Sequence, residues 1–356
     1  MTATPRRLDR RGWLGEAITI LCAGALAATS RASAVAQARG DFDDLYTPQV
    51  DRAIARGLDY LSQMYRGGAF RTPRWGENLG VCSLASLAML SRGHRPGEGR
   101  EGQMVTSIAQ RLTASAGPQG FINDPRSQSH GPMYEHAFAT LLLAEIYGTA
   151  AANGLGQVEL STTIAAAIDL MVRSQTDRGG WRYDPRPTEA DLSVTVAVVM
   201  ALRAARNSGF YVPDECVELA VEYIRRSQNP DGGFAYRLDG SPSRMPLTAA
   251  AIVALYNCGV SGGLELQRAF AYLEDFEPTR DLTGYYFYAH YYSAQAYWHR
   301  GGEAWPAWYS GLVRRLLSLQ GGNGSWIDSG QGNEYATAMA CLILNTPRSV
   351  LPIYQR

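Results

Sequence analysis

The chain has 356 residues, of which 46% are hydrophobic, so it is long enough to bury a large core. Its 33 basic residues balance its 33 acidic residues, and this zero formal net charge gives no support for a nucleic-acid-binding function.

The first 38 residues have the pattern of a cleavable export signal. Four arginines before residue 12 are followed by an apolar stretch at 17–28 and by small-residue cleavage sites within 34–38. The pair Arg10-Arg11, followed by Gly-Trp-Leu, resembles a twin-arginine signal, which exports folded proteins. We therefore expect an exported protein that is periplasmic or secreted, or else associated with the membrane.

Four cysteines follow the signal segment, and none has the spacing of a metal site. Three of them lie in apolar helical runs, where cysteine usually serves as a small core residue. One disulfide is compatible with an oxidising compartment, and the sequence leaves its pairing open. The four are Cys82, Cys216, Cys258 and Cys341.

An internal repeat organises residues 39–356 into one domain. Residues 175–181, 228–234 and 320–326 share the pattern Gln-x-x-x-Gly-x-aromatic, and residues 63–70 carry a looser copy. The spacing between these copies indicates two further, degenerate ones. They are found at 114–121 and 272–286, which makes six units of about 53 residues.

Each unit predicts two helices. An amphipathic helix leads into the Gln-Gly-aromatic turn, and a nearly all-apolar helix follows after a loop. Because a helix that is apolar on all sides must be buried on all sides, we predict an all-α (α/α)6 toroid, a double barrel with the apolar helices inside and very little strand. The predicted inner helices cover 81–90, 137–146, 194–204, 248–255, 291–298 and 336–344.

The three strict repeats resemble the QW motif of the squalene–hopene and oxidosqualene cyclases. The same toroid occurs in protein prenyltransferase β subunits and in the thioester domain of complement proteins. The resemblance implies a structural motif in which Gln caps a helix end and the aromatic ring stacks on it. Four further segments resemble a group of exported bacterial prenyltransferase/squalene cyclase repeat proteins that is common in planctomycetes: 130–136, 191–195, 288–292 and 351–354.

The chain departs from the catalytic motifs of these families. Class II terpene cyclases protonate an alkene with the middle Asp of a DxDD motif, whereas this chain keeps one acid, Asp191, at a comparable helix start. Prenyltransferases hold zinc with an Asp-x-Cys pair and a distant His. Here the inner-helix position reads Asp191-x-Ser193, and Asp214-Glu-Cys216 begins an outer helix. We therefore expect no metal and no other cofactor.

Candidate site residues lie just before or at the start of the inner helices, whose N-termini should gather at one mouth of the toroid and favour anions. Each has a structural alternative: Asp191 is either a desolvated acid or an N-cap, and His136 and His290 are either acid–base groups or internal hydrogen-bonding groups. The aromatic run 285–292 either lines a carbocation site or packs. The predicted ligand-binding residues are Tyr134, Glu135, Arg244, Tyr288, Tyr291, Glu334 and Tyr335.

Three functions fit these features. The first is binding of a lipid, isoprenoid-like or other small ligand in the central cavity; if the protein is an enzyme, this becomes a cyclase or isomerase with Asp191 as the acid. The second is a polysaccharide lyase or hydrolase, since exported toroids also serve that chemistry. The third is a non-catalytic module that binds an envelope protein through the mouth.

Overall fold

The computed structural model describes residues 45–72, 74–129, 131–148, 155–186, 188–277 and 285–355. The predicted export signal, residues 1–38, and His130 of the second repeat lie outside these ranges. All that follows concerns the unit that begins at Leu45.

Twelve α-helices of two alternating kinds make up the described part of the chain. The inner helices are α3 (Leu79–Ser91), α5 (Pro132–Gly148), α7 (Leu192–Asn207), α9 (Met245–Asn257), α11 (Tyr286–Arg300) and α13 (Asn333–Asn345). The outer helices are α2 (Pro48–Met64), α4 (Gly99–Ala114), α6 (Gln157–Arg173), α8 (Asp214–Arg226), α10 (Leu264–Glu274) and α12 (Ala304–Leu319). Every predicted inner-helix segment lies within its observed helix.

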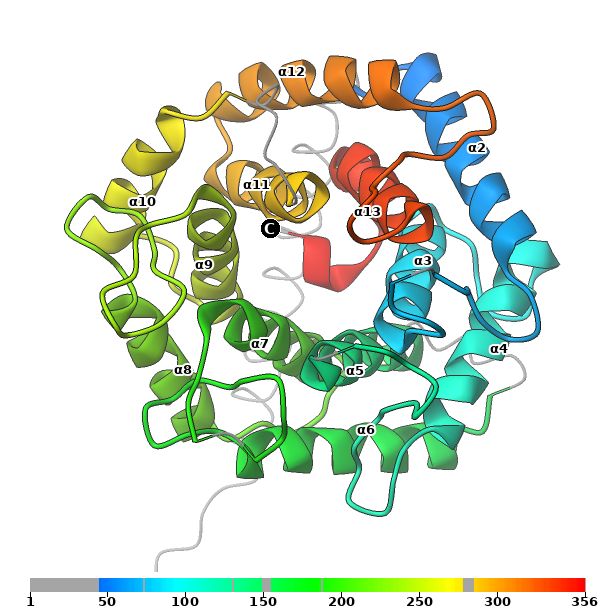
Figure 1. Cartoon of the computed structure of the whole chain (residues 1–356), viewed down its shortest axis with the longest axis horizontal. Coiled ribbons are helices and arrows are strands. Elements are labelled where there is room, and N and C mark those ends of the chain that lie inside the picture. Colours follow the sequence, from blue (N-terminus) through cyan, green and yellow to red (C-terminus); the bar gives the residue numbers. More distant parts are fainter. Residues whose placement is uncertain are drawn as a thin grey trace, which may run out of the picture. The chain divides into compact units, whose positions relative to one another are not determined.

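The inner helices form a closed ring, in which each contacts the next and α13 contacts α3. The outer helices surround this ring and pack against it (Figure 1). Only isolated β-bridges, and no strands, occur in the described residues, so the predicted (α/α)6 toroid is confirmed. No helix among these residues is both long and apolar enough to cross a membrane.

Residue patterning explains the two layers. In α9 every residue from Leu247 to Leu255 is buried, as its uniformly apolar sequence predicts. In α8 the buried residues recur at helical spacing, at Cys216, Ala220, Tyr223 and Ile224, while the opposite face is charged. The layer that each helix joins therefore follows from the width of its apolar face.

The glutamine of each strict repeat joins two outer helices. The Nε2 group of Gln175 donates to the carbonyl of Gly179 in its own turn, at 2.8 Å, and to that of Cys216 in α8, at 2.9 Å. Gln228 bonds to α10 in the same way, and Gln320 bonds to Ala53 in α2 at 2.8 Å. The glutamine thus clasps its turn to the following outer helix, and the stacking of the aromatic ring that the resemblance implies stays a prediction.

The glycine and the aromatic residue of the repeat complete this clasp. Gly179 has a φ of +91°, and a Cβ there would lie 2.0 Å from the carbonyl oxygen of Leu219 in α8, so no larger residue fits. Trp181 is fully buried, and its indole N–H donates to the carbonyl of Met171 at 2.7 Å. Trp326 repeats this bond with Leu316 at 2.8 Å.

The segment after α13 turns into the middle of the ring. Two short 3-10 helices follow, η2 (Thr346–Arg348) and η3 (Pro352–Tyr354), and η3 contacts α7 at the centre (Figure 1). The hydroxyl groups of Tyr354 and Tyr291 are 2.9 Å apart, and the Ile353 N–H donates to Glu145 Oε1 at 3.2 Å. This segment therefore fills part of the inner barrel with the chain's own side chains.

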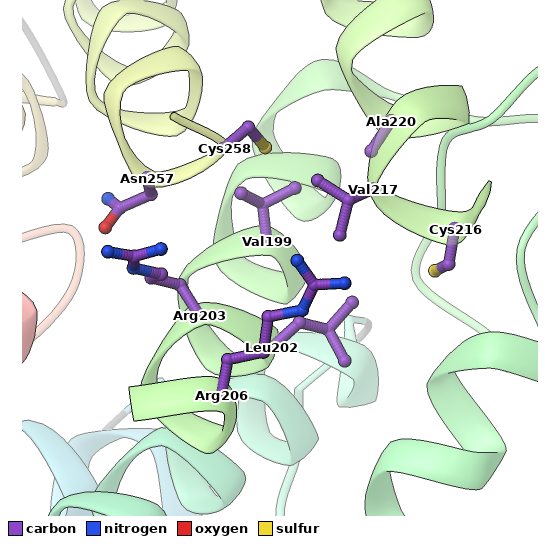
Figure 2. A pocket seen from close by; sticks show the side chains of 9 residues that line it. All are labelled: Val199, Leu202, Arg203, Arg206, Cys216, Val217, Ala220, Asn257 and Cys258. Carbon is purple, nitrogen blue, oxygen red and sulfur yellow. The ribbon is translucent and has the colours of Figure 1, made fainter. Parts of the chain in front are cut away.

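All four cysteines that follow the signal segment are free thiols, so the disulfide left open by the sequence is not formed. Cys216 and Cys258 line a small pocket with Arg203 and Arg206 between α7, α8 and α9 (Figure 2). Its volume of about 30 Å³ has room for only about two water molecules. We therefore exclude this pocket as a site for an organic ligand.

Candidate functional site at the mouth of the toroid

One position near the start of four of the six inner helices serves the repeat rather than a ligand. Thr195 Oγ1 accepts the backbone N–H of Trp181 at 3.0 Å, and Thr248 and Thr337 accept the N–H of the corresponding aromatic residue. In the second repeat His136 Nδ1 accepts the Ile122 N–H at 3.1 Å. These acceptors are the fourth or fifth residue of their helices, and they face the outer layer.

This register accounts for both candidate histidines. His136 is fully buried, and its Nε2 lies 3.3 Å from the carbonyl of Ala167, so both ring nitrogens are engaged. Burial lowers the pKa of His136 to about 4, so the ring is neutral at pH 7. His290 is also the fifth residue of its helix. It packs against Tyr286 of the same helix and against Trp308 of the outer helix α12. Neither histidine faces the mouth, and we assign both to the scaffold.

Asp191 combines a capping role with an unused oxygen. It is the N-cap of α7: its Oδ1 accepts the Val194 N–H at 3.0 Å and the Ser193 hydroxyl at 2.6 Å. The side chain is fully buried, and its Oδ2 has no hydrogen-bond partner among the described residues. Burial raises the pKa of Asp191, although the bonds from Ser193 and Val194 oppose this shift. The N-cap and the acid are therefore compatible roles for one side chain.

A series of three tyrosines is linked to this carboxyl group. The Tyr134 hydroxyl donates to Ser193 Oγ at 2.6 Å, which links Tyr134 to Asp191 through one hydroxyl group. The Tyr134 ring lies 6.2 Å from that of Tyr183, whose hydroxyl is 2.6 Å from the hydroxyl of Tyr236. Burial raises the pKa of Tyr134 and Tyr236, and the charge of Asp191 raises both further, so these hydroxyl groups stay protonated.

Two more tyrosines approach from the far side of the ring. Tyr288 and Tyr335 are each the third residue of their inner helix, α11 and α13. Burial raises the pKa of Tyr288, and the charges of Tyr292, Tyr134, Tyr335 and Asp191 raise it further. The Tyr288 hydroxyl has no partner among the described residues. We call the following set the mouth cluster: Tyr134, Tyr183, Asp191, Ser193, Tyr236, Tyr288 and Tyr335.

The other predicted ligand-binding residues lie elsewhere or already have partners. Glu135 is buried, and its two oxygens accept the Leu79 N–H at 2.9 Å and the Ser127 hydroxyl at 2.6 Å, so it caps the neighbouring helix α3. Glu334 Oε1 accepts the Tyr60 hydroxyl of α2 at 3.3 Å. These two acids tie helices together.

Tyr291 and Arg244 differ from these acids. Tyr291 is one helical turn further along α11 than Tyr288, and its hydroxyl group bonds to Tyr354. Arg244 is at the N-cap position of α9 with an exposed side chain and makes no ion pair within the described ranges. Of the predicted ligand-binding residues outside the mouth cluster, Arg244 is the one with an exposed side chain.

Tyr183, Tyr236 and Tyr223 are not among the residues that the sequence pattern predicts for the site. The signal for the first two was present, because each lies two residues after the turn aromatic, Trp181 or Phe234. Aligning the repeats at this position would have found the pair. Tyr223 lies on the buried face of α8, and its sequence context does not distinguish it from core packing.

A groove adjoins the mouth cluster. It encloses about 340 Å³ between the loop that leads into Asp191, the loop that precedes α9, and helix α8. The described residues contain no group of three or more His, Cys, Asp and Glu side chains that could hold a metal ion. The lining of the groove consists of Arg178, Thr188, Glu189, Ala190, Tyr223, Arg237, Leu238 and Asp239.

Known structures share this architecture at low sequence identity. The chain superimposes on a variant of the type II terpene cyclase MstE from Scytonema, bound to its substrate geranylgeranyl dihydroxybenzoate, with a TM-score of 0.58 and 13% identity over 84% of this chain and 97% of that one. It matches the cellobiose 2-epimerase of Spirochaeta thermophila with a TM-score of 0.59 and 14% identity, over 88% and 97%. These likenesses show the fold alone.

One curated relative matches locally. The drimenyl diphosphate synthase of Streptantibioticus cattleyicolor is 35% identical over 91 residues, which is 26% of this chain and 16% of that protein. The chain thus matches about one sixth of its length. The family model "Prenyltransferase alpha-alpha toroid domain" covers residues 75–280, more than half of the chain. The protein belongs to the prenyltransferase α/α-toroid domain family.

Proposed function

We propose that the protein binds a small isoprenoid-like ligand at the mouth cluster and that Asp191 is the acid that acts on it. The observation that carries this proposal is the unused, buried Oδ2 of Asp191. A polar atom that is buried without a partner costs stability, so its retention at the start of an inner helix favours a functional role.

The hydrogen bonds of Asp191 fix where its proton would reside. Oδ1 accepts two hydrogen bonds, which leaves Oδ2 as the oxygen that carries the acidic proton. Transfer of that proton to an alkene carbon forms a C–H bond and leaves a carboxylate, which Ser193 and the Val194 N–H already stabilise. The tyrosine faces would stabilise the resulting cation. Loss of a proton from that cation returns the acid, so the net reaction is an isomerisation or cyclisation.

Incubation with squalene and geranylgeranyl diphosphate tests this proposal, with binding followed by protein fluorescence and products by chromatography. We expect Asp191→Asn to retain the Oδ1 cap and the fold, to bind ligand with altered affinity, and to form no product. Asp184→Asn, at an exposed loop acid, is the matched control. If neither lipid is bound or converted, or if Asp191→Asn behaves like the control, the proposal is wrong.

A saccharide is the second candidate ligand, and the density of hydroxyl groups favours it. Five tyrosines and one serine of the mouth cluster offer donors and acceptors of the kind that sugars require. A glycan panel separates the two candidate ligands. If the site binds an isoprenoid, the isoprenoid competes for the site; if the site binds a saccharide, a glycan of the panel binds and the isoprenoid does not compete.

Export remains a proposal that rests on residues 1–38 of the sequence, and so does an envelope protein partner. Cell fractionation of the source organism, with Arg10→Lys and Arg11→Lys together in the signal, tests export. Retention of the precursor by the double variant is the expected result, and unchanged localisation would contradict it. A pull-down from the envelope fraction, with Asp191→Asn as the comparison, tests the partner.

A further inference from the structure

The groove beside the mouth cluster has the size of a ligand site. Its volume of about 340 Å³ is within the usual range for pockets that hold small molecules and is about ten times that of the pocket between Cys216 and Cys258. Two loops and a helix build it, and the segment Thr188–Ala190 runs directly into Asp191.

A buried hydroxyl group without a partner lies in its wall. Tyr223 is 1% exposed, and its hydroxyl has no hydrogen-bond partner among the described residues. Burial raises the pKa of Tyr223, so the hydroxyl is a donor over the whole physiological range. The Nε–H of Arg237 is likewise buried and unpartnered within that part of the chain.

Some charged side chains of the groove form ion pairs and others do not. Glu189 is shared by two guanidinium groups, those of Arg182 at 3.2 Å and Arg237 at 3.3 Å, and is thereby neutralised. Arg178 is exposed and has no ion pair in the described ranges. Asp239, the other acid of the lining, accepts the Ser241 N–H at 3.0 Å. The donors without a partner among the described residues are the Tyr223 hydroxyl and the Arg237 Nε–H, and Asp239 is an exposed carboxylate of the same lining.

An oxyanion matches these unpartnered donors together with the exposed guanidinium group of Arg178. Hydrogen bonds to a charged group are about twice as strong as neutral ones, and arginine with a hydroxyl donor is a common arrangement around phosphate and carboxylate.

We infer that this groove binds a phosphate or carboxylate group through Arg178, Arg237 and the Tyr223 hydroxyl. The site is separate from the mouth cluster, and it stands whether or not Asp191 is an acid catalyst. Two sources would present the same chemistry: a free oxyanion in solution and the head group of an anionic lipid.

Calorimetry with inorganic phosphate and with acetate, and flotation with vesicles that contain phosphatidate, tests the site. We expect the wild-type protein to bind at least one of these probes. Tyr223→Phe, Arg178→Gln and Arg237→Gln should each weaken that binding about tenfold, the value of one hydrogen bond to a charged group. Arg226→Gln, on the exposed face of α8, is the matched control and should bind normally.

The stability of Tyr223→Phe distinguishes a ligand donor from a structural hydroxyl. Because the Tyr223 hydroxyl has no hydrogen-bond partner among the described residues, its removal should leave the unfolding midpoint of the ligand-free protein unchanged or raise it. Binding of vesicles alone assigns the site to a lipid head group, and binding of phosphate alone assigns it to a free anion. Absence of binding to all probes, equal binding by Tyr223→Phe, or a loss of stability in that variant would each overturn the inference.

Discussion

Replacement of Glu145 tests how the segment 351–355 is held in the barrel. This glutamate lies in α5 and is 2% exposed; its Oε1 accepts the Ile353 N–H, and its Oε2 has no partner among the described residues. Burial raises the pKa of Glu145 from 4.5 to about 8, and the bond from Ile353 opposes part of that shift. The folded protein therefore holds a proton on this carboxyl group that the unfolded chain releases near pH 4.5.

The difference between the pKa of Glu145 in the folded protein and in the unfolded chain sets how much the stability changes with pH. At about 1.36 kcal/mol per pKa unit, the interval from 4.5 to about 8 corresponds to about 5 kcal/mol of stability. A raised carboxyl pKa contributes fully below the unfolded value of 4.5, and this contribution is lost as the pH rises toward 8. Buried His136, with its pKa lowered from 6.5 to about 4, acts in the opposite sense as the pH falls below 6.5. The difference between the wild type and a Glu145 variant removes that second effect.

Urea unfolding of the wild type and Glu145→Gln, at one-unit intervals between about pH 5 and about pH 9, measures the effect. The amide keeps the acceptor for Ile353 and cannot ionise. We expect the stability of the variant relative to the wild type to rise by about 1.4 kcal/mol per pH unit and to level off near pH 8. Glu159→Gln, an exposed acid of α6, should show no such slope. A relative stability of Glu145→Gln that is independent of pH would refute the reasoning.

The clasp between repeats yields two more predictions. Gly179→Ala and Gly209→Ala both place a side chain at a φ near +90°, but only the first side chain meets a backbone oxygen. In urea unfolding we therefore expect Gly209→Ala to lose about 1–2 kcal/mol of stability and Gly179→Ala to lose at least about 1–3 kcal/mol more. Equal losses of stability would contradict the packing argument. Gln228→Leu removes one hydrogen bond within its own turn and one to α10 and should cost about 1–3 kcal/mol, whereas an unchanged unfolding midpoint would show that the clasp contributes nothing.

The sequence predicts the fold because the information for it is local and repeated. A uniformly apolar helix such as α9 has no alternative to the inner layer, and the strict turns at Gln175, Gln228 and Gln320 mark the register of three units. The degenerate second unit still forms, because Gly120 keeps its positive φ and His136 replaces the threonine acceptor.

The site is less predictable, because its geometry depends on contacts between distant residues. Residue type marks Asp191 and Tyr134 as candidates, but nothing local distinguishes them from Glu135, which caps α3 across 56 positions of sequence. Glu145 was hidden in a run classed as apolar, since the Ile353 N–H that bonds it is 208 residues away. Such long-range partners decide which polar groups remain free.

The bond from Gln320 to Ala53 spans 267 residues and joins the last unit to the first with the same geometry that joins neighbours along the chain. An open array of repeats exposes the apolar flanks of its two terminal units and needs modified capping repeats. Here no unit is terminal in space, so the helices need no such caps. Cyclic order, rather than the position of the chain break, specifies the architecture, and a circular permutant opened in the exposed loop at 209–211 should assemble the same ring.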